Sequence, residues 1–203
     1  MIRAGRQADI DRLLQVERLA AEVLLGHGAH DLFAMHSLSS IELENGIVNG
    51  ILRVAEAEGM AIGFALCGRI DDHAHLLEMD VVPEYGRRGI GGALLEAVCE
   101  EASRQGYSSM TLTTLRDVPW NAPFYARHGF VELPESSWGP ELHEIMRRER
   151  MLGFPMHLRV VMQRGEHAPC HDLAFPCRAQ GARYASGSCI ATHRPPPSRL
   201  CSD

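Results

Sequence analysis

The stretch MDVVPEYGRRGIGGALL, at residues 79–95, combines a strand, a glycine-rich loop and the start of a helix. Its first residues favour a strand, and Ala93, Leu94 and Leu95 begin a helical spacing of apolar residues that Gly106 ends. The first backbone N–H groups of a helix have no partner within it, and they lie at the positive end of the helix dipole. The loop therefore either binds phosphate oxygens or only turns the chain and caps the helix.

Alternating and helical patterns on both sides of this stretch predict further elements. Strands are predicted at 2–3, 50–57, 60–70, 75–82, 109–115, 130–133 and 157–162. Helices are predicted at 7–25, 39–48, 91–103, 119–128 and 139–151. Short turns at Glu58-Gly59 and Asp71-Asp72 join three consecutive strands into an antiparallel meander. We predict an α/β (α+β) fold over residues 1–164, with a mixed, mostly antiparallel central sheet flanked by helices.

Residues 165–203 differ in character from the rest of the 203-residue chain. They include the run Pro195-Pro196-Pro197 and have no long amphipathic period. They also contain four of the six cysteines, namely Cys170, Cys177, Cys189 and Cys201. The cysteine spacing fits no paired metal-ligand module, so we predict a disordered tail without a metal site.

Composition excludes several classes of function. All 20 basic residues are arginine, which excludes a Walker A loop, a pyridoxal Schiff base and a lysine nucleophile. The net charge is −6 without a basic block, which argues against nucleic-acid binding and suits a cationic ligand. With no apolar run near the roughly 18 residues of a membrane span and no signal-like segment, we predict a cytoplasmic protein that does not bind membranes. Both a monomer and a homodimer are compatible with this sequence.

Two stretches resemble the GNAT superfamily of N-acetyltransferases. Residues 81–95 resemble the coenzyme A motif Q/R-x-x-G-x-G/A, with Gly86 where the family prefers Gln or Arg. Residues 121–130 are similar to the family's helix ending in F-Y-x-x-x-G-F. A dinucleotide fingerprint fits less well, because Leu94 stands where its third glycine belongs.

The resemblance implies a GNAT-like fold and acetyl-CoA as the cofactor. It implies that the backbone N–H of Met79 faces the acetyl oxygen and that of Val81 the pantetheine. Asn121 lies one helical turn from Val118, the position of a family asparagine, and is a further candidate contact. The predicted cofactor-binding residues are Met79, Val81, Arg87, Arg88, Gly89, Ile90, Gly91, Gly92 and Asn121.

Tyr125 matches the family's general acid, whose phenol protonates the leaving thiolate. Two residues of the strand before the glycine loop are alternative candidates for the general base that deprotonates the amine. His75 stands six residues before Val81, where some members carry a glutamate, and a histidine could accept the proton. Glu78 is the other candidate, although alternation puts it on the opposite strand face from His75 unless a bulge changes the parity.

The resemblance implies an acetyl-CoA-dependent N-acetyltransferase, an acyltransferase in which the amine of a small molecule or peptide attacks the thioester directly. The alternative is a non-catalytic acyl-CoA-binding or regulatory module on the same fold, since His75, Val118 and Gly86 depart from the family pattern. A weaker third alternative is a dinucleotide enzyme.

Overall fold

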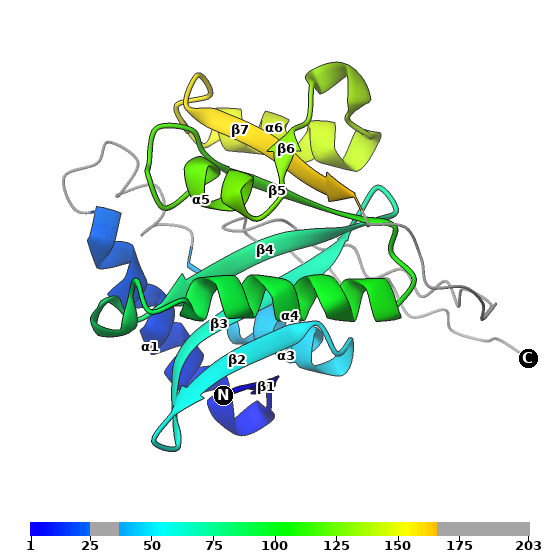
Figure 1. Cartoon of the computed structure of the whole chain (residues 1–203). Coiled ribbons are helices and arrows are strands. Elements are labelled where there is room, and N and C mark those ends of the chain that lie inside the picture. Colours follow the sequence, from blue (N-terminus) through cyan, green and yellow to red (C-terminus); the bar gives the residue numbers. More distant parts are fainter. Residues whose placement is uncertain (25–36, 166–203) are drawn as a thin grey trace, which may run out of the picture.

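The computed structural model describes residues 1–24 and 37–165, which form one seven-stranded sheet with helices on both faces (Figure 1). The strands are β1 (Ile2–Ala4), β2 (Leu52–Ala57), β3 (Met60–Ile70), β4 (His73–Val81), β5 (Ser109–Leu115), β6 (Val131–Glu132) and β7 (Arg159–Gly165). The α-helices are α1 (Ile10–Ala21), α3 (Ser40–Val48), α4 (Ile90–Arg104), α5 (Ala122–Arg127) and α6 (Pro140–Met151). Short 3-10 helices are η1 (Gln7–Asp9), η2 (Glu22–Leu24), η3 (Pro83–Tyr85) and η4 (Glu135–Ser137).

The strand order is β1-β2-β3-β4-β5-β7-β6. The first four strands pair antiparallel, which confirms the predicted meander. Between β4 and β5 the pairing is parallel, and β7 pairs antiparallel with both β5 and β6. The predicted fold class, a mixed and mostly antiparallel sheet flanked by helices, is confirmed.

Several predicted boundaries shift by a few residues, and two of these shifts concern α5 and the end of the folded part. The helix predicted at 119–128 begins only at Ala122, because Pro123 suits the first turn of a helix and Asn121 before it has non-helical dihedral angles. The last strand runs to Gly165, which pairs with Ser109, so the sheet extends one residue beyond the predicted boundary at 164. The rest of the predicted tail, 166–203, lies outside the described residues.

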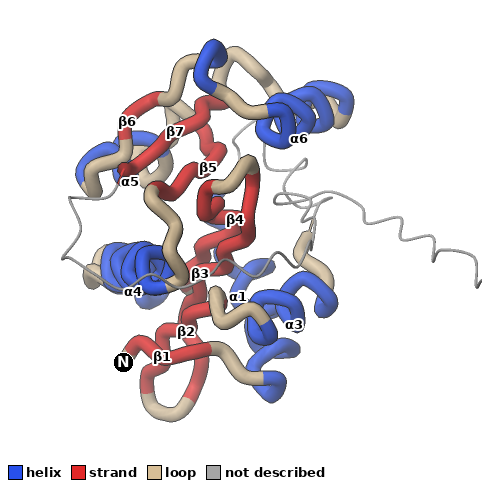
Figure 2. Tube along the Cα trace, turned by 90° about the vertical axis from the view of Figure 1, so that its right-hand side faces the viewer, coloured by secondary structure: helices blue, strands red, loops and turns tan. Residues whose placement is uncertain are grey.

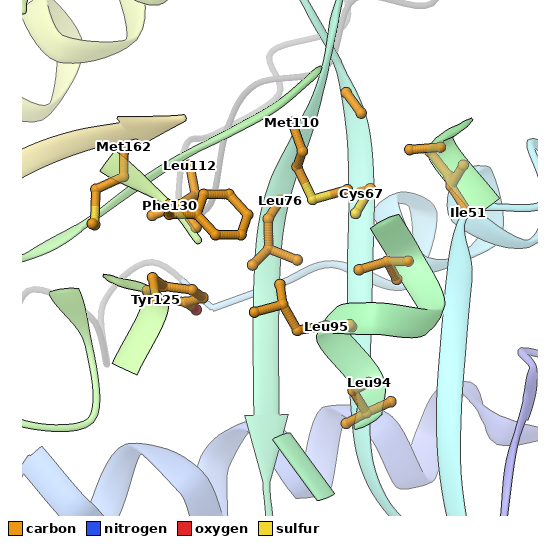
Figure 3. Close-up of a cluster of buried hydrophobic side chains, with 14 of the residues drawn as sticks. Ile51, Cys67, Leu76, Leu94, Leu95, Met110, Leu112, Tyr125, Phe130 and Met162 are labelled. Carbon is orange, nitrogen blue, oxygen red and sulfur yellow. The ribbon is translucent and has the colours of Figure 1, made fainter. Parts of the chain in front are cut away.

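Helices cover the two faces of the sheet unequally. Figure 2 shows α4 and α5 on one side of the strands and α1, α3 and α6 on the other. The largest apolar cluster lies between the sheet and α4, and it includes Leu76, Leu94, Leu95, Tyr125 and Phe130 (Figure 3). A second cluster packs α1 and α3 against β2 and β3, and a third lies under α6.

Asp71 joins the turn between β3 and β4 to the start of α6. Its carboxylate accepts hydrogen bonds from the backbone N–H of Glu141 at 2.8 Å and of Leu142 at 2.7 Å. We expect Asp71→Ala to lower the free energy of unfolding by about 1–2 kcal/mol, because these helix-end donors lose their acceptor. Urea unfolding would measure the change. The matched control is Asp72→Ala, which also places alanine at positive φ but removes a side chain that is 91% exposed. Equal losses in both variants would attribute the effect to backbone strain instead of the cap.

Candidate active site

The site begins where two neighbouring strands part. β4 pairs with β5 only over three residue pairs, from Ala74 with Met110 to Leu76 with Leu112. β4 then continues to Val81 along β3 without further pairing to β5. The part of β4 that carries Met79 and Val81 therefore borders an opening in the sheet, as Figure 1 shows by the divergence of β4 and β5.

A β-bulge in β4 sets which side chains face this opening. Leu66 of β3 pairs with Glu78, whereas the next residue, Cys67, pairs with Leu76, so Leu77 is an extra residue. Leu76 and Met79 consequently both pack on the α4 face. Because neighbouring strand residues alternate, Glu78 then shares the opposite face with His75. Simple alternation predicts that Glu78 and His75 lie on opposite faces of the strand, and the bulge puts them on the same face.

A cleft of about 1080 Å³ runs from the glycine loop to the end of α1. Its lining contains most of the predicted site residues, namely Glu78, Met79, Val81, Arg87, Gly89, Gly91, Gly92, Asn121 and Tyr125. Arg88 and Ile90 are not part of this lining. The Arg88 guanidinium lies over the Tyr85 ring, 5.2 Å from its centroid, and Ile90 packs against the apolar cluster under α4.

The glycine loop presents backbone donors to the cleft. Gly89 precedes α4 with a φ of 81°, a left-handed conformation that glycine adopts without strain. The Ala93 N–H donates to the Gly89 carbonyl at 3.0 Å, so the N–H groups of Ile90, Gly91 and Gly92 precede the first hydrogen bond of the helix. At Gly92 a Cβ atom would lie 2.9 Å from the His128 ring, so α4 and α5 approach closely there. This cradle fits a diphosphate.

His75 lies inside the sheet. Its side chain is only 1% exposed, its Nδ1 is 2.8 Å from the Thr111 hydroxyl, and it does not belong to the cleft lining. Burial, together with the positive charge of Arg159, lowers the pKa of His75 to about 3. The structure therefore separates His75 from Tyr125, whereas it brings Glu78 and Tyr125 to one cleft.

The cleft carboxylates hold protons more tightly than ordinary ones. Burial is the main cause that raises the pKa of both Glu78 and Asp80, and the negative charge of Glu17 raises both further. Burial also raises the pKa of Glu17 itself to about 7. Sequence reasoning missed Glu17, since its place beside the apolar stripe of α1 does not reveal which strand it faces.

Tyr125 enters the cleft from α5 with its ring fixed by aromatic neighbours. It makes edge contacts with Phe124 and Phe130, at centroid distances of 5.2 and 5.8 Å, and Figure 3 shows the ring lying beside that of Phe130. Burial raises its pKa, and so do the charges of Glu78 and Asp80. The phenol therefore remains protonated at neutral pH and can donate a proton. Glu78, whose pKa is raised to about 8, can accept a proton in its ionised form, and the fraction in that form increases as the pH rises.

Residues 1–24 and 37–165 contain neither a candidate metal site nor a candidate membrane-spanning helix. No group of three histidine, cysteine, aspartate or glutamate side chains is placed to hold a metal ion there. Nor does any helix in that part of the chain combine the length and apolar character needed to cross a bilayer.

Comparison with protein families gives a match that covers the part of this site formed by β4, the glycine loop and α5. The family model described as an acetyltransferase (GNAT) domain matches residues 49–132. That span begins just before β2 and ends in β6, so it includes β4, the glycine loop and α5.

Solved structures resemble the chain over most of its length. PaiA N-acetyltransferase of Thermoplasma acidophilum, in complex with coenzyme A, is 21% identical with a TM-score of 0.61, over 82% of this chain and 98% of that one. The ribosomal-protein-S18-alanine N-acetyltransferase of Escherichia coli is 18% identical with a TM-score of 0.57, and the match covers 86% of this chain and 99% of that chain. N-acetylglutamate synthase of Neisseria gonorrhoeae, complexed with coenzyme A and N-acetyl-glutamate, is 21% identical with a TM-score of 0.63. That match covers 83% of this chain and 35% of the synthase chain. At these identities the likeness establishes the shared fold.

Proposed function

Because residues 49–132 match the model of the GNAT acetyltransferase domain, we propose that this chain transfers the acetyl group of acetyl-CoA to an amine that attacks the thioester directly. One observation carries this proposal. A single cleft joins the amide donors at the start of α4 to Glu78 on β4 and Tyr125 on α5. Binding of a diphosphate and proton transfer are thereby combined in one site.

The cofactor supplies an activated acetyl thioester, and residues on two sides of the cleft hold it. The N–H groups of Ile90, Gly91 and Gly92, with the positive end of the α4 dipole behind them, bind the diphosphate. Arg87, which lines the same end of the cleft, adds a positive charge. On the part of β4 that is not paired with β5, the backbone N–H of Met79 binds the acetyl oxygen and that of Val81 binds the pantetheine.

Glu78 and Tyr125 perform the two proton transfers. The Glu78 carboxylate removes one proton from the acceptor ammonium, and a carbon–nitrogen bond then forms as the carbon–sulfur bond breaks. The Tyr125 hydroxyl protonates the departing thiolate, and the second proton that the nitrogen loses restores the phenol. The two steps support each other. The negative charges of Glu78 and Asp80 raise the pKa of Tyr125, so protonation of Glu78 makes the phenol a stronger acid as the thiolate leaves.

Thiol release from acetyl-CoA tests this function against a panel of polyamines, aminoglycosides, amino acids and peptide N-termini. We expect acceptor-dependent release with a cationic amine, and a product whose mass is higher by one acetyl group. Calorimetric binding of coenzyme A without turnover for any acceptor would support the non-catalytic acyl-CoA-binding alternative. No affinity for coenzyme A would overturn both proposals, and affinity for NAD instead would favour a dinucleotide enzyme.

Two neighbouring arginines allow a matched test of the phosphate site. Arg87 lines the cleft, whereas the Arg88 guanidinium stacks on Tyr85. We expect Arg87→Ala to weaken coenzyme A binding about tenfold, the effect of losing one charge-assisted contact to a phosphate. Arg88→Ala should weaken binding by less than about threefold. Calorimetry measures the affinity of each variant for coenzyme A and for pantetheine, which lacks the phosphates. If Arg87→Ala weakens binding of the two ligands equally, Arg87 makes no phosphate contact.

A further inference from the structure

Three carboxylates from two separate elements line one part of the cleft. Glu17 belongs to α1, while Glu78 and Asp80 belong to β4. Glu78 and Asp80 are two residues apart in a regular stretch of β4 and therefore share one strand face, and α1 packs against β3 and β4. Glu17 is held in place by the Leu38 N–H, which donates to its carboxylate at 2.7 Å. The fold therefore gathers the three side chains in a fixed arrangement.

One oxygen of this group has no hydrogen-bond partner among the residues that the structure describes. The Oδ2 atom of Asp80 is buried, although Asp80 belongs to the cleft lining. A carboxylate oxygen that has lost water and gained no donor costs free energy. A donor on a molecule bound in the cleft would satisfy it.

The surroundings keep these carboxylates from ionising readily. The other titratable or charged groups that act on this region are Arg18 on α1, Glu42 on α3, Tyr125 on α5 and Arg159 on β7. Arg18 lowers the pKa of Glu17 and Arg159 lowers that of Glu78, but burial is the larger cause in both cases and the pKa is raised. A cation that binds here would therefore displace protons from the carboxylates.

We infer that Glu17, Glu78 and Asp80 form one binding site for the cationic end of the acceptor, and that Glu17 makes the enzyme prefer cationic acceptors to neutral ones. This inference rests on the proposed function, because it identifies the acceptor end of the same cleft. An ammonium group has three N–H donors and no acceptor, which matches three carboxylates. An acceptor group that carries its own carboxylate would be repelled.

Glu17 has a role that differs from that of Glu78. Glu78 removes the proton that must leave before the nitrogen attacks, whereas Glu17 and Asp80 bind the cation before that step. Loss of the Glu17 charge should therefore act on KM for a charged acceptor more than on kcat. A purely structural role for Glu17 would change both kinetic parameters for every acceptor.

The first experiment compares acceptors in the Glu17→Gln variant, whose amide oxygen can still accept from Leu38. We expect the ratio of kcat/KM for butylamine, a cation at pH 7, to kcat/KM for methoxyamine, which is neutral, to fall about tenfold. The matched control is Glu22→Gln, which removes the same charge from an exposed position in the same cleft lining. An unchanged ratio in Glu17→Gln, or an equal fall in the control, overturns the inference.

The second experiment needs neither turnover nor a variant. Calorimetric titration of the wild-type protein with butylammonium chloride at pH 7, in two buffers of different ionisation enthalpy, counts the protons released on binding. We expect release of about one proton per bound cation. Binding without proton release, or no binding, overturns the inference. If butylammonium binds with proton release but acetyl-CoA gives no turnover, the cation site stands and the proposed function fails.

Discussion

Replacing Tyr125 with phenylalanine is expected to lower kcat by about 10²- to 10³-fold, the usual contribution of a positioned general acid. The phenylalanine ring keeps the edge contacts with Phe124 and Phe130, so folding should be retained. What is lost is the hydroxyl that protonates the departing thiolate. Steady-state thiol release at saturating acetyl-CoA and acceptor measures the effect.

The control for this change is a second tyrosine of the same cleft. Tyr85 also lines it, beside the glycine loop, but lies under the Arg88 guanidinium and has no role as an acid in the proposal. Tyr85→Phe should lower kcat by less than about threefold. If Tyr125→Phe turns over at the wild-type rate, another group must protonate the sulfur and the assignment of Tyr125 is wrong.

Replacing Glu78 with glutamine should lower kcat/KM at pH 7 by about 10²-fold and flatten its pH profile. A base must be unprotonated to act, and burial raises the pKa of Glu78 above its usual range. The wild-type activity should therefore rise with pH through this raised pKa, and the variant should lose most of the rise. Kinetics from pH 6 to 10 would measure the profile of both proteins. A rise in activity that remains in the Glu78→Gln variant near pH 7 would be assigned to Glu17, whose pKa is about 7.

The same profile separates Glu78 from His75 as the base. Because burial lowers the pKa of His75 to about 3, His75 is already unprotonated at pH 6 and would give no rise above that pH. A flat wild-type profile that Glu78→Gln leaves unchanged would favour His75. Its position against Thr111 inside the sheet, away from the cleft lining, argues for Glu78.

The sequence predicted those parts of the fold that local chemistry controls. The turns at 58–59 and 71–72 and the glycine loop contain residues suited to positive φ, so the meander and the start of α4 could be placed from neighbouring residues alone. The position of Tyr125 in the cleft could also be anticipated from a short local pattern, while its role as the acid stays a prediction.

Features that depend on partners far along the chain could not be predicted. The bulge at Leu77 arises from the register between β3 and β4, so the face that Glu78 occupies was left open. Glu17 joins the site only because α1 packs on β4. Adjacent arginines are equivalent in the sequence, but Arg88 turns onto Tyr85 while Arg87 lines the cleft.

The short parallel ladder between β4 and β5 joins the two halves of the sheet that carry the proposed catalytic residues. In the proposed mechanism, the proton acceptor Glu78 and the phosphate-binding loop belong to the amino-terminal half, while the proton donor Tyr125 lies on α5 in the carboxyl-terminal half. Only the three residue pairs from Ala74 to Leu76 join β4 to β5 along this seam. The spacing between these two groups depends on this short ladder and on the apolar cluster that packs Tyr125 against the α4 side of the sheet. A change that widens the seam would therefore move the two groups apart without touching either one.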